Sequence, residues 1–418
     1  MKVFDLPEGW KFVSLYDLVD VIGGVSYSPE DITSSGIRVI RGGNIQGNLV
    51  ELRDDDVYLP VTYKNSENTL YKGDIVLVAS TGSVEALGRT ATVWENMENV
   101  QIGAFLRILR PKHPKYAALI SSWLSSEHYF RYIRLVAKGT SINNISLSHI
   151  KGFKIPIPPD EKATSFTALY NAVAKKININ RAINQNLEAL AKQLYDYWFV
   201  QFDFPNEEGK PYKSSDGAMV WNEKLKRYIP EGWKVLPLFD AVSVQYGFPF
   251  TTEQFTEEKT SVPVVRIRDI LEGTTSAFSL EKADEKYHLN EGDVLVGMDG
   301  NFHMNFWHDN IAYLNQRCVR LRPHSDSTIS SIQILHSIKP YIKAKEQNAK
   351  GSTVGHLSDK DLKGLFLVKP LNSKTFNPRK MLDGLLALVI ENKRQILSLT
   401  KQRDELLPLL LNGQVTTE

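Results

Sequence analysis

The chain contains 418 residues, 42% of them hydrophobic and 23% charged, which is the composition of an ordinary soluble globular protein with room for two or three domains. Its single cysteine, Cys318, excludes an internal disulfide framework, and the apolar alternating run around it indicates a buried core thiol. No apolar run approaches the ~18–20 residues that span a bilayer, and the first residues lack the apolar stretch of a secretion signal. We therefore expect a cytoplasmic protein without a membrane segment.

The formal net charge of +2 is modest for a protein that binds a polyanion alone. Affinity for duplex DNA that does not depend on sequence comes mainly from lysine and arginine side chains that neutralise phosphates. A near-neutral chain can still contact bases, but we expect it to rely on a partner for part of its attraction to nucleic acid.

Along the chain, a Pro-Glu-Gly-Trp turn signal at Pro7 comes first, followed by a short amphipathic stretch. Short runs that favour β-strands come next. The expected strands are Ile37–Arg41, Ile75–Ala79, Thr90–Val93 and Phe105–Leu109. A helical pattern covers Lys115–Val136, and a Lys-Gly-Thr-Ser segment precedes a last β-run into Pro156.

A long helical pattern follows. One set of residues recurs every seven positions, and a second set is interleaved with it. The first set is Phe166, Val173, Asn180, Leu187 and Leu194, and the second is Leu169, Lys176, Ile183, Leu190 and Tyr197. Such heptads predict a coiled coil, in which a polar asparagine fixes register at some cost in stability. A surface helix packed on its own domain is the alternative. About forty residues at ~1.5 Å each would make a spacer of roughly 60 Å.

A polar segment with Pro205, Gly209, Pro211 and Gly217 then indicates a linker.

The same order of features now repeats. Pro7–Lys11 returns as Pro230–Lys234 at an offset of 223, and Arg110-Pro111 returns as Arg322-Pro323 at 212. In between, the offset is 225 for Arg41 and Arg266 and 219 for Gly73-Asp74 and Gly292-Asp293. A frame that keeps its register while its loops drift predicts two copies of one scaffold with different surfaces.

The second copy has its own strands, helix and heptads. The expected strands are Pro263–Ile267, Val294–Gly297 and Val319–Leu321, and the expected helix is Thr328–Gln347, which we expect Pro340 to break. The heptad sets are Leu385, Asn392, Leu399 and Leu406, interleaved with Met381, Leu388, Gln395, Gln402 and Leu409. Strands and helices without strict alternation favour an α+β fold class. The expected domains are 1–158 and 229–371, with long helices at 159–202 and 372–418 and a linker at 203–228.

Motifs for catalysis are missing from the sequence. There is no P-loop and no glycine fingerprint that opens a βαβ unit, so no nucleotide or S-adenosylmethionine fold is visible. Pro158-Pro159-Asp160 has no aromatic residue after it, unlike the motif of adenine methyltransferases, and Asp160-Glu161-Lys162 is typical of a helix start. Asp299, His303, His308 and Asp309 could suggest a metal site, but they lack fixed ligand spacing, and a polar reading loop explains them better. We expect a non-catalytic chain with no cofactor or metal of its own.

Polar runs flanked by glycines are suited to contact base edges, because Asn and Gln match adenine, Arg matches guanine and Asp matches cytosine. The repeated Lys-Gly-Thr/Ser-Ser/Thr segments are instead suited to position phosphates. A solvated turn is the alternative for any one of these residues. The predicted DNA-binding residues of the first copy are Arg41, Ser80, Thr81, Ser83, Arg89, Lys138, Thr140, Ser141 and Asn143. Those of the second copy are Arg266, Asp299, Asn301, His303, Asn305, Lys350, Ser352, Thr353 and His356.

Several motifs give the chain a resemblance to the specificity subunits of type I restriction–modification enzymes. They are the two Pro-Glu-Gly-Trp openings, the Gly-Asp-Ile/Val-Leu-Val elements at Gly73 and Gly292, the segment Leu194–Pro205 and the ending Leu406–Val415. The resemblance covers essentially the whole chain in the family's order of recognition domain, long helix, recognition domain and long helix.

The resemblance implies two target-recognition domains that each read one half of a split, asymmetric site in double-stranded DNA. It also implies that the long helices pair as an antiparallel coiled coil, with pseudo-two-fold symmetry, to set the gap between the halves. Two methyltransferase subunits and restriction subunits would be the partners. S-adenosylmethionine, ATP and Mg²⁺ would then be used only in those partners, which methylate adenine N6 or cleave DNA. A recognition subunit of a related type II enzyme and a coiled-coil scaffold that does not bind DNA are the alternatives.

Overall fold

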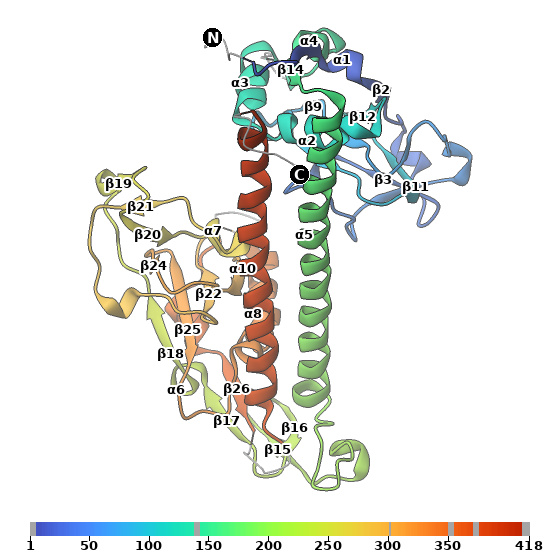
Figure 1. The fold of residues 1–418 in the computed structure, drawn as a ribbon. Helices are drawn as coiled ribbons and strands as arrows, with labels where there is room; N and C mark the ends of the chain where they lie inside the picture. Colours follow the sequence, from blue (N-terminus) through green and yellow to red (C-terminus); the bar gives the residue numbers. More distant parts are fainter. Residues whose placement is uncertain (1–5, 138–142, 301, 350–354, 371–375, 412–418) are drawn as a thin grey trace. The chain divides into compact units, whose positions relative to one another are not determined.

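The structure is a computed structural model that describes residues 6–137, 143–300, 302–349, 355–370 and 376–411. It divides into two compact units, the first made of residues 1–177 and 398–418 and the second of residues 178–397. The division falls inside two long helices, so each unit contains one domain of mixed strands and helices together with a part of both helices (Figure 1). The α+β class expected from the sequence is confirmed.

The centre of the first unit is an antiparallel sheet with the strand order β10-β8-β12-β2. These strands are β2 Val19–Gly23, β8 Ile75–Val78, β10 Thr90–Thr92 and β12 Leu106–Pro111. All four side chains of β8 are buried, and they alternate between two hydrophobic clusters. Ile75 and Leu77 belong to one cluster, and Val76 and Val78 belong to the other, because successive side chains of a strand point to opposite faces of the sheet.

One face of this sheet is covered by helices and the other by a second sheet. The helices are α1 Leu15–Leu18, α2 Ala117–Leu124, α3 Glu127–Val136 and α4 Leu147–Gly152. The second sheet has the order β6-β3-β11-β7, with β3 Ile37–Ile40, β6 Val57–Leu59, β7 Thr69–Leu70 and β11 Met97–Ile102. Three short pairs complete the unit: β1 Lys11–Ser14 with β14 Lys154–Ile157, β9 Ser80–Thr81 with β13 Asn143–Asn144, and β4 Ile45–Gln46 with β5 Leu49–Val50.

The second unit repeats this sheet as β18-β25-β22-β23, in the same order of equivalent strands. Its strands are β18 Val242–Tyr246, β22 Val294–Gly297, β23 Met304–Phe306 and β25 Cys318–Pro323. A smaller sheet has the order β19-β21-β20-β24, with β19 Phe255–Thr256, β20 Val262–Val265, β21 Phe278–Ser279 and β24 Tyr313–Leu314. The terminal pair is β17 Lys234–Pro237 with β26 Phe366–Lys369, and the helices are α6 Leu238–Ala241, α7 Asp269–Glu272, α8 Ser331–Ala349 and α9 Asp359–Lys363. The matching strand order confirms that the chain contains two copies of one scaffold.

The helix break that we expected at Pro340 of the second copy is absent, and the helical segment of the first copy is broken instead. Helix α8 continues through Pro340, whereas the first copy's helical segment divides into α2 and α3. A proline inside a helix costs ~3 kcal/mol, but Ile334, Ile338 and Ile342 are all buried in the core around it, and their burial offsets that cost. The break in the first copy is made by Ser126, whose side chain accepts a hydrogen bond from the backbone N–H of Tyr129 and caps α3.

The segment after the first long helix contributes to the core of the second unit. Helix α5, Asp160–Tyr195, is followed by a π-helical turn at Asp196–Val200. Beyond it, Phe202 and Phe204 are buried, and Phe204 stacks on Trp233 with ring centroids 4.7 Å apart. The polar stretch that we interpreted as a linker also contains a hairpin, formed by β15 Met219–Asn222 and β16 Arg227–Pro230.

Helix α5 runs beside α10, Pro378–Leu411, in both units (Figure 1). In the first unit, Phe166 and Tyr170 share a hydrophobic cluster with Leu406 and Leu410. In the second unit, Asn180 Nδ2 donates to Gln395 Oε1 at 3.0 Å, and Asn184 Nδ2 donates to the Val389 carbonyl at 3.2 Å. Residue numbers rise along one helix and fall along the other, so the pairing is antiparallel.

The first predicted heptad set forms this seam in both helices, but the second set was wrong by one residue. The buried or half-buried second column consists of Tyr170, Ile177, Asn184 and Ala191 in α5, and of Leu382, Val389, Ile396, Arg403 and Leu410 in α10. The side chains that we had placed there are exposed, and we call them the outer column: Leu169, Lys176, Ile183 and Leu190 in α5, Tyr197 in the π-helical turn after it, and Met381, Leu388, Gln395, Gln402 and Leu409 in α10. The two columns of a heptad seam are separated alternately by three and by four residues. An apolar residue that follows the first set by either three or four positions therefore fits the pattern.

Candidate nucleic-acid interface

A backbone frame in the first unit brings together three segments that are far apart in the sequence. The N–H of Ala79, just after β8, donates to the carbonyl of Phe105 at 3.0 Å. The carbonyl of Ala79 accepts from the N–H of Ile145 at 2.7 Å. Next to these bonds, β9 and β13 place Ser80 opposite Asn144. Residues 80, 105 and 144 are therefore held at one place on the surface.

The second unit builds the same frame from equivalent residues. The N–H of Met298 donates to the carbonyl of Arg317 at 2.9 Å, and the N–H of Leu357 donates to the carbonyl of Met298 at 2.8 Å. An isolated antiparallel bridge then places Asp299 opposite His356. We call the two equivalent sets the bridge clusters: Ser80, Phe105 and Asn144 in the first unit, and Asp299, Arg317 and His356 in the second.

The side chains of the second bridge cluster bind one another. Nδ1 of His356 donates to Oδ1 of Asp299 at 2.5 Å, and NH1 of Arg317 lies 3.0 Å from Oδ2 of the same carboxylate. Both oxygens of Asp299 therefore already have partners inside the domain. Arg317 and His356 are the more exposed members of the set, with side chains 60% and 54% accessible to solvent.

The first bridge cluster is uncharged. Asn144 is exposed, Ser80 is half-buried, and the ring of Phe105 is 67% exposed. The same frame therefore presents an aromatic ring, an amide and a hydroxyl in one unit, and a guanidinium, an imidazole and a carboxylate in the other. These groups can make different sets of contacts with the edges of bases.

The sequence had singled out Ser80, Asp299 and His356, but it missed three other members of the bridge clusters, Phe105, Arg317 and Asn144. The structure adds these three because strand pairing, rather than proximity in the sequence, brings them to the site. One signal was available. Phe105 and Arg317 both lie one residue before strands that match at the offset of 212.

Other predicted residues of the first unit lie in β9, in the loop after it and in β13. Thr81 is half-buried and its hydroxyl accepts from the N–H of Ser83, which is exposed. Arg89 is half-buried, and its Nε donates to the carbonyl of Glu85 at 3.1 Å. Asn143 pairs with Thr81 through the backbone of β13 and β9.

The two arginines that match between the copies have different surroundings. Arg41 is exposed, and its NH2 donates to the carbonyl of Asp55 at 3.1 Å. Arg266 forms two hydrogen bonds with Asp269, from Nε at 2.9 Å and from NH2 at 3.1 Å. Since Asp269 is buried, the guanidinium of Arg266 already neutralises a carboxylate within its own domain.

The polar run that we interpreted as one long reading loop in the second copy is partly a strand, which corrects that interpretation. Asn305 lies in β23, and its Nδ2 donates to the carbonyls of Ile270 and Leu271 at 3.2 Å each. Nδ1 of His303 lies 3.3 Å from the carbonyl of Ile267. The flanking aromatic residues Phe302, Phe306 and Trp307 are buried and anchor the run in the core.

The remaining predicted residues lie outside the described part of the chain. They are Lys138, Thr140, Ser141, Asn301, Lys350, Ser352 and Thr353.

The acidic and histidine side chains that could have suggested a metal site have separate partners. Nε2 of His308 lies 3.0 Å from Nζ of Lys393, and burial lowers the pKa of His308 to about 3, so the ring is neutral. Asp309 accepts a hydrogen bond from Nε1 of Trp307 at 2.9 Å. Among the described residues, no group of three or more His, Cys, Asp or Glu could hold a metal ion. Cys318 is fully buried as expected, and its burial raises the pKa of the thiol to about 12.

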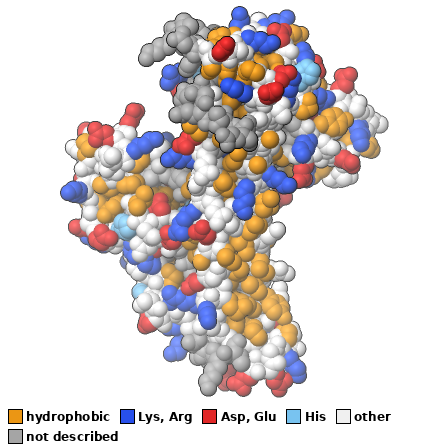
Figure 2. Space-filling model, viewed as in Figure 1, with side chains coloured by type: hydrophobic (Ala, Val, Ile, Leu, Met, Phe, Trp, Pro, Cys, Tyr) orange, Lys and Arg blue, Asp and Glu red, His pale blue; other side chains and the backbone are white. Residues whose placement is uncertain are grey.

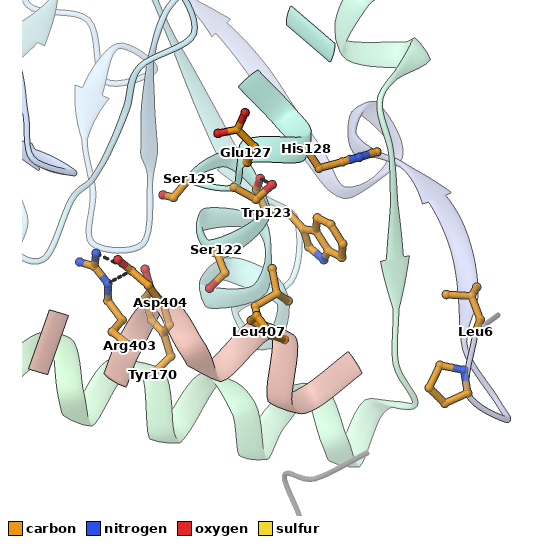
Figure 3. Close-up of a pocket in the computed structure, with 13 residues that line it drawn as sticks. Leu6, Ser122, Trp123, Ser125, Glu127, His128, Tyr170, Arg403, Asp404 and Leu407 are labelled. Atoms are coloured by element: carbon orange, nitrogen blue, oxygen red, sulfur yellow. Dashed lines mark hydrogen bonds and ion pairs between the residues drawn. The ribbon is translucent and has the colours of Figure 1, made fainter. Parts of the chain in front are cut away.

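The first unit contains a cavity of about 490 Å³ that no residue of the bridge cluster lines, and Figure 3 shows its lining. It is lined by the junction of α2 and α3, by Tyr170 of α5 and by the end of α10, where Arg403 and Asp404 form an ion pair. None of the predicted DNA-binding residues lines it. The bridge clusters, rather than this cavity, are therefore the candidate interface.

The duplicated architecture has a counterpart among known families. The type I restriction modification DNA specificity domain matches the chain twice, at residues 7–189 and at residues 230–372. The chain belongs to this family. The two matches together cover most of the chain, and each includes one complete bridge cluster.

Individual members of the family are similar over much of the chain. The type I restriction enzyme MjaIX specificity subunit of Methanocaldococcus jannaschii is 21% identical over 441 residues, which cover 99% of this chain and 95% of that protein. The EcoBI specificity subunit of Escherichia coli is 31% identical over 194 residues, 46% of this chain and 41% of that protein.

A solved structure has a similar fold. The S subunit of the type I restriction–modification system from M. genitalium is 15% identical, with a TM-score of 0.54 over 100% of this chain and 98% of that one. The fold of this specificity-domain protein is therefore that of a type I S subunit. In the described ranges, no helix is long and apolar enough to cross a membrane.

Proposed function

We propose that the chain is the DNA-recognition subunit of a type I restriction–modification complex, and that it reads a bipartite, asymmetric site with one half-site for each recognition domain. The observation that carries this proposal is the pair of bridge clusters. The same backbone frame occurs twice, with hydrogen bonds of nearly equal length, and holds unlike side chains. A frame of this kind suits two recognition domains that bind DNA in the same orientation and prefer different bases.

Chemistry on the DNA is assigned to partner subunits. We propose that two methyltransferase subunits methylate adenine N6 with S-adenosylmethionine, and that restriction subunits cleave unmodified DNA with ATP and Mg²⁺. The chain itself then determines the DNA sequence at which these partners act. A division of this kind is consistent with its formal net charge of only +2, because partners would supply part of the contact with phosphates.

The outer column supports a docking surface for the methyltransferase subunits. In the second unit, Ile183 and Leu190 of α5 and Tyr197 of the π-helical turn after it are exposed and recur every seven residues. Figure 2 shows hydrophobic side chains gathered in a band along this part of the helix. α10 has equivalent exposed residues, Met381, Leu388 and Leu409. Exposed apolar stripes on both repeats favour two equivalent partners, because such stripes usually mark interaction sites.

Duplex-binding measurements test the proposal. The full chain, mixed with a candidate methyltransferase subunit, is incubated with randomised duplexes, and the bound DNA is sequenced. We expect a preferred motif with two defined halves separated by an undefined spacer. Binding without any sequence preference would instead support a coiled-coil scaffold. A split motif read together with a methyltransferase fused to a nuclease would support the related type II assembly.

A further inference from the structure

The residues at positions 105 and 317 are equivalent in the backbone and differ completely in chemistry. Each lies in a tight turn before the central strand β12 or β25, and each accepts a hydrogen bond from the residue that precedes the bridge. The next residue along the chain, Leu106 or Cys318, is fully buried. The fold therefore fixes the position of the backbone while it leaves the side chain at 105 or 317 outside.

The ring of Phe105 is only partly covered by its own domain. Its ring is 67% exposed although it lies at the end of a strand whose next residue is in the core. The exposed face of the first bridge cluster therefore combines this ring with the polar side chains of Ser80 and Asn144. An aromatic ring beside short polar groups is suited to contact the methyl group of thymine while the polar groups bind neighbouring base edges.

Arg317 is held in place by one carboxylate. Its NH1 lies 3.0 Å from Oδ2 of Asp299, while the side chain as a whole is 60% exposed. Asp299 is held in turn by His356 on its other oxygen. The ion pair restricts the guanidinium without burying the side chain, so less conformational entropy is lost when the guanidinium binds a second group.

We propose that Arg317 and Phe105 are specificity-determining residues at equivalent positions of the two recognition domains. Arg317 binds the O6 and N7 atoms of a guanine in one half-site, and Asp299 is its positioning residue. Phe105 contacts a thymine methyl group in the other half-site. The inference rests on the proposed function and goes beyond it by naming the residues and the bases. It also assigns Asp299 a different role from the expected contact with cytosine, because each of its oxygens already binds a side chain of its own domain.

The test uses the full chain with its methyltransferase subunit and the randomised duplexes described above. For Arg317→Ala we expect the preference for guanine at one position of one half-site to fall at least about tenfold, with the other half-site unchanged. Arg317→Lys keeps the charge but not the two-pronged geometry, so it should lose the same preference. Phe105→Ala should lower a thymine preference in the opposite half-site only.

A second set of variants tests the role of Asp299. Asp299→Asn removes a negative charge that repels phosphates, so overall DNA affinity should rise while the guanine preference falls at the same position as in Arg317→Ala. The double variant should lose no more preference than Arg317→Ala alone, because the two residues act as one unit. Lys226→Ala is the control, since this exposed lysine belongs to the hairpin of β15 and β16 and its removal should leave both half-sites unchanged.

Three results would overturn the inference. An Arg317→Ala chain that keeps its motif but shows a weaker salt dependence of binding would make Arg317 a phosphate contact. A preference restored by Arg317→Lys would show that charge alone matters. Loss of both half-sites together in either alanine variant would indicate a structural role. A wild-type chain without any preferred motif would instead overturn the proposed function itself.

Discussion

Arg110 binds the carboxylate of Asp74 through two hydrogen bonds, from Nε at 2.8 Å and from NH2 at 2.9 Å. Asp74 is buried, and its Oδ2 also accepts from the N–H of Tyr71. This bond raises the pKa of Arg110. Arg322 and Asp293 repeat the arrangement in the second unit, at 2.6 and 2.7 Å. A two-pronged ion pair thus joins the central sheet of each domain to the loop before β8 or β22.

Removing one partner of this pair should destabilise its domain strongly. For Arg110→Met we expect a loss of about 3 kcal/mol or more in the stability of the first unit, because a buried carboxylate is left without a partner. Arg110→Lys should lose less, since it keeps the charge. Hydrogen exchange of the amides in β8 and β12 measures the effect locally. Arg131→Ala, which removes an exposed ion pair with Glu127, is the control and should change exchange by less than about 1 kcal/mol. Equal losses in the two variants would contradict this account of the pair.

The repeated strands and helices could be predicted well from the sequence, because their signals are local patterns of residues. Buried runs such as Ile75–Val78, the helix signals and the matched offsets all depend on residues close together in the chain. Side chains in contact across long loops could not be predicted in the same way. Asp299 and His356 were both chosen as DNA-binding residues, but nothing in the sequence indicated that they bind each other. Arg317 was missed because one arginine before a strand carries no signal by itself.

The long helices show a different limit of sequence analysis. Apolar residues occupy three columns in these helices, whereas a pair of helices needs only two. The sequence could not decide which column is left out, and the more apolar choice was the wrong one in α5. Asn184 is buried in the seam, while Ile183 beside it is exposed. Asn184 has a partner within the seam, the carbonyl of Val389, and the exposed Ile183 is understandable if another protein covers the outer column.

The outer column should therefore be required for methyltransferase binding. We expect the double variant Ile183→Asp and Leu190→Asp to weaken that binding at least tenfold, since each buried leucine or isoleucine contributes about 1.5–3 kcal/mol. Leu135→Asp is the matched control, because Leu135 is equally apolar and more exposed but lies on α3. Co-purification and circular dichroism would be measured together. Normal binding by a folded double variant would exclude this surface.

The pairing of α5 with α10 should set the length of the spacer between the half-sites. Seven residues inserted into each helix keep the heptad register and add about 10.5 Å. At about 3.4 Å per base pair, the spacer of the preferred motif should grow by about three base pairs, while the half-sites stay the same. The motif would be read by sequencing bound duplexes. A spacer of unchanged length would show that the paired helices do not set the distance between the half-sites.

The second unit should lose stability in mild acid because of His336. Burial, with Lys339 and Lys192 nearby, lowers the pKa of His336 to about 4. Its pKa is higher in the unfolded chain, ~6.5, so the unfolded state binds more protons between these two values and stability falls as pH falls. Between pH 7 and pH 5 the expected loss is about 2 kcal/mol.

Leucine at this position is the informative replacement, because Leu124 is the equivalent residue in the first unit and is fully buried. His336→Leu removes the titrating group, although it also removes the contact of the imidazole ring with the ring of Tyr195. We expect the variant to unfold with a flatter dependence on pH between 5 and 7, as followed by hydrogen exchange of α8. The same acid sensitivity in wild type and variant would assign the effect to another group.

We propose that this one chain directs methylation to a site with two separate halves. A map of N6-methyladenine in the genome of a host that carries this chain and its partner subunits, made with and without the chain, tests it most directly. We expect that one split motif, with two defined halves and an undefined spacer, loses its methylation when the chain is deleted. A methylated motif that is continuous, or a map that does not change although the partner subunits are active, would contradict it.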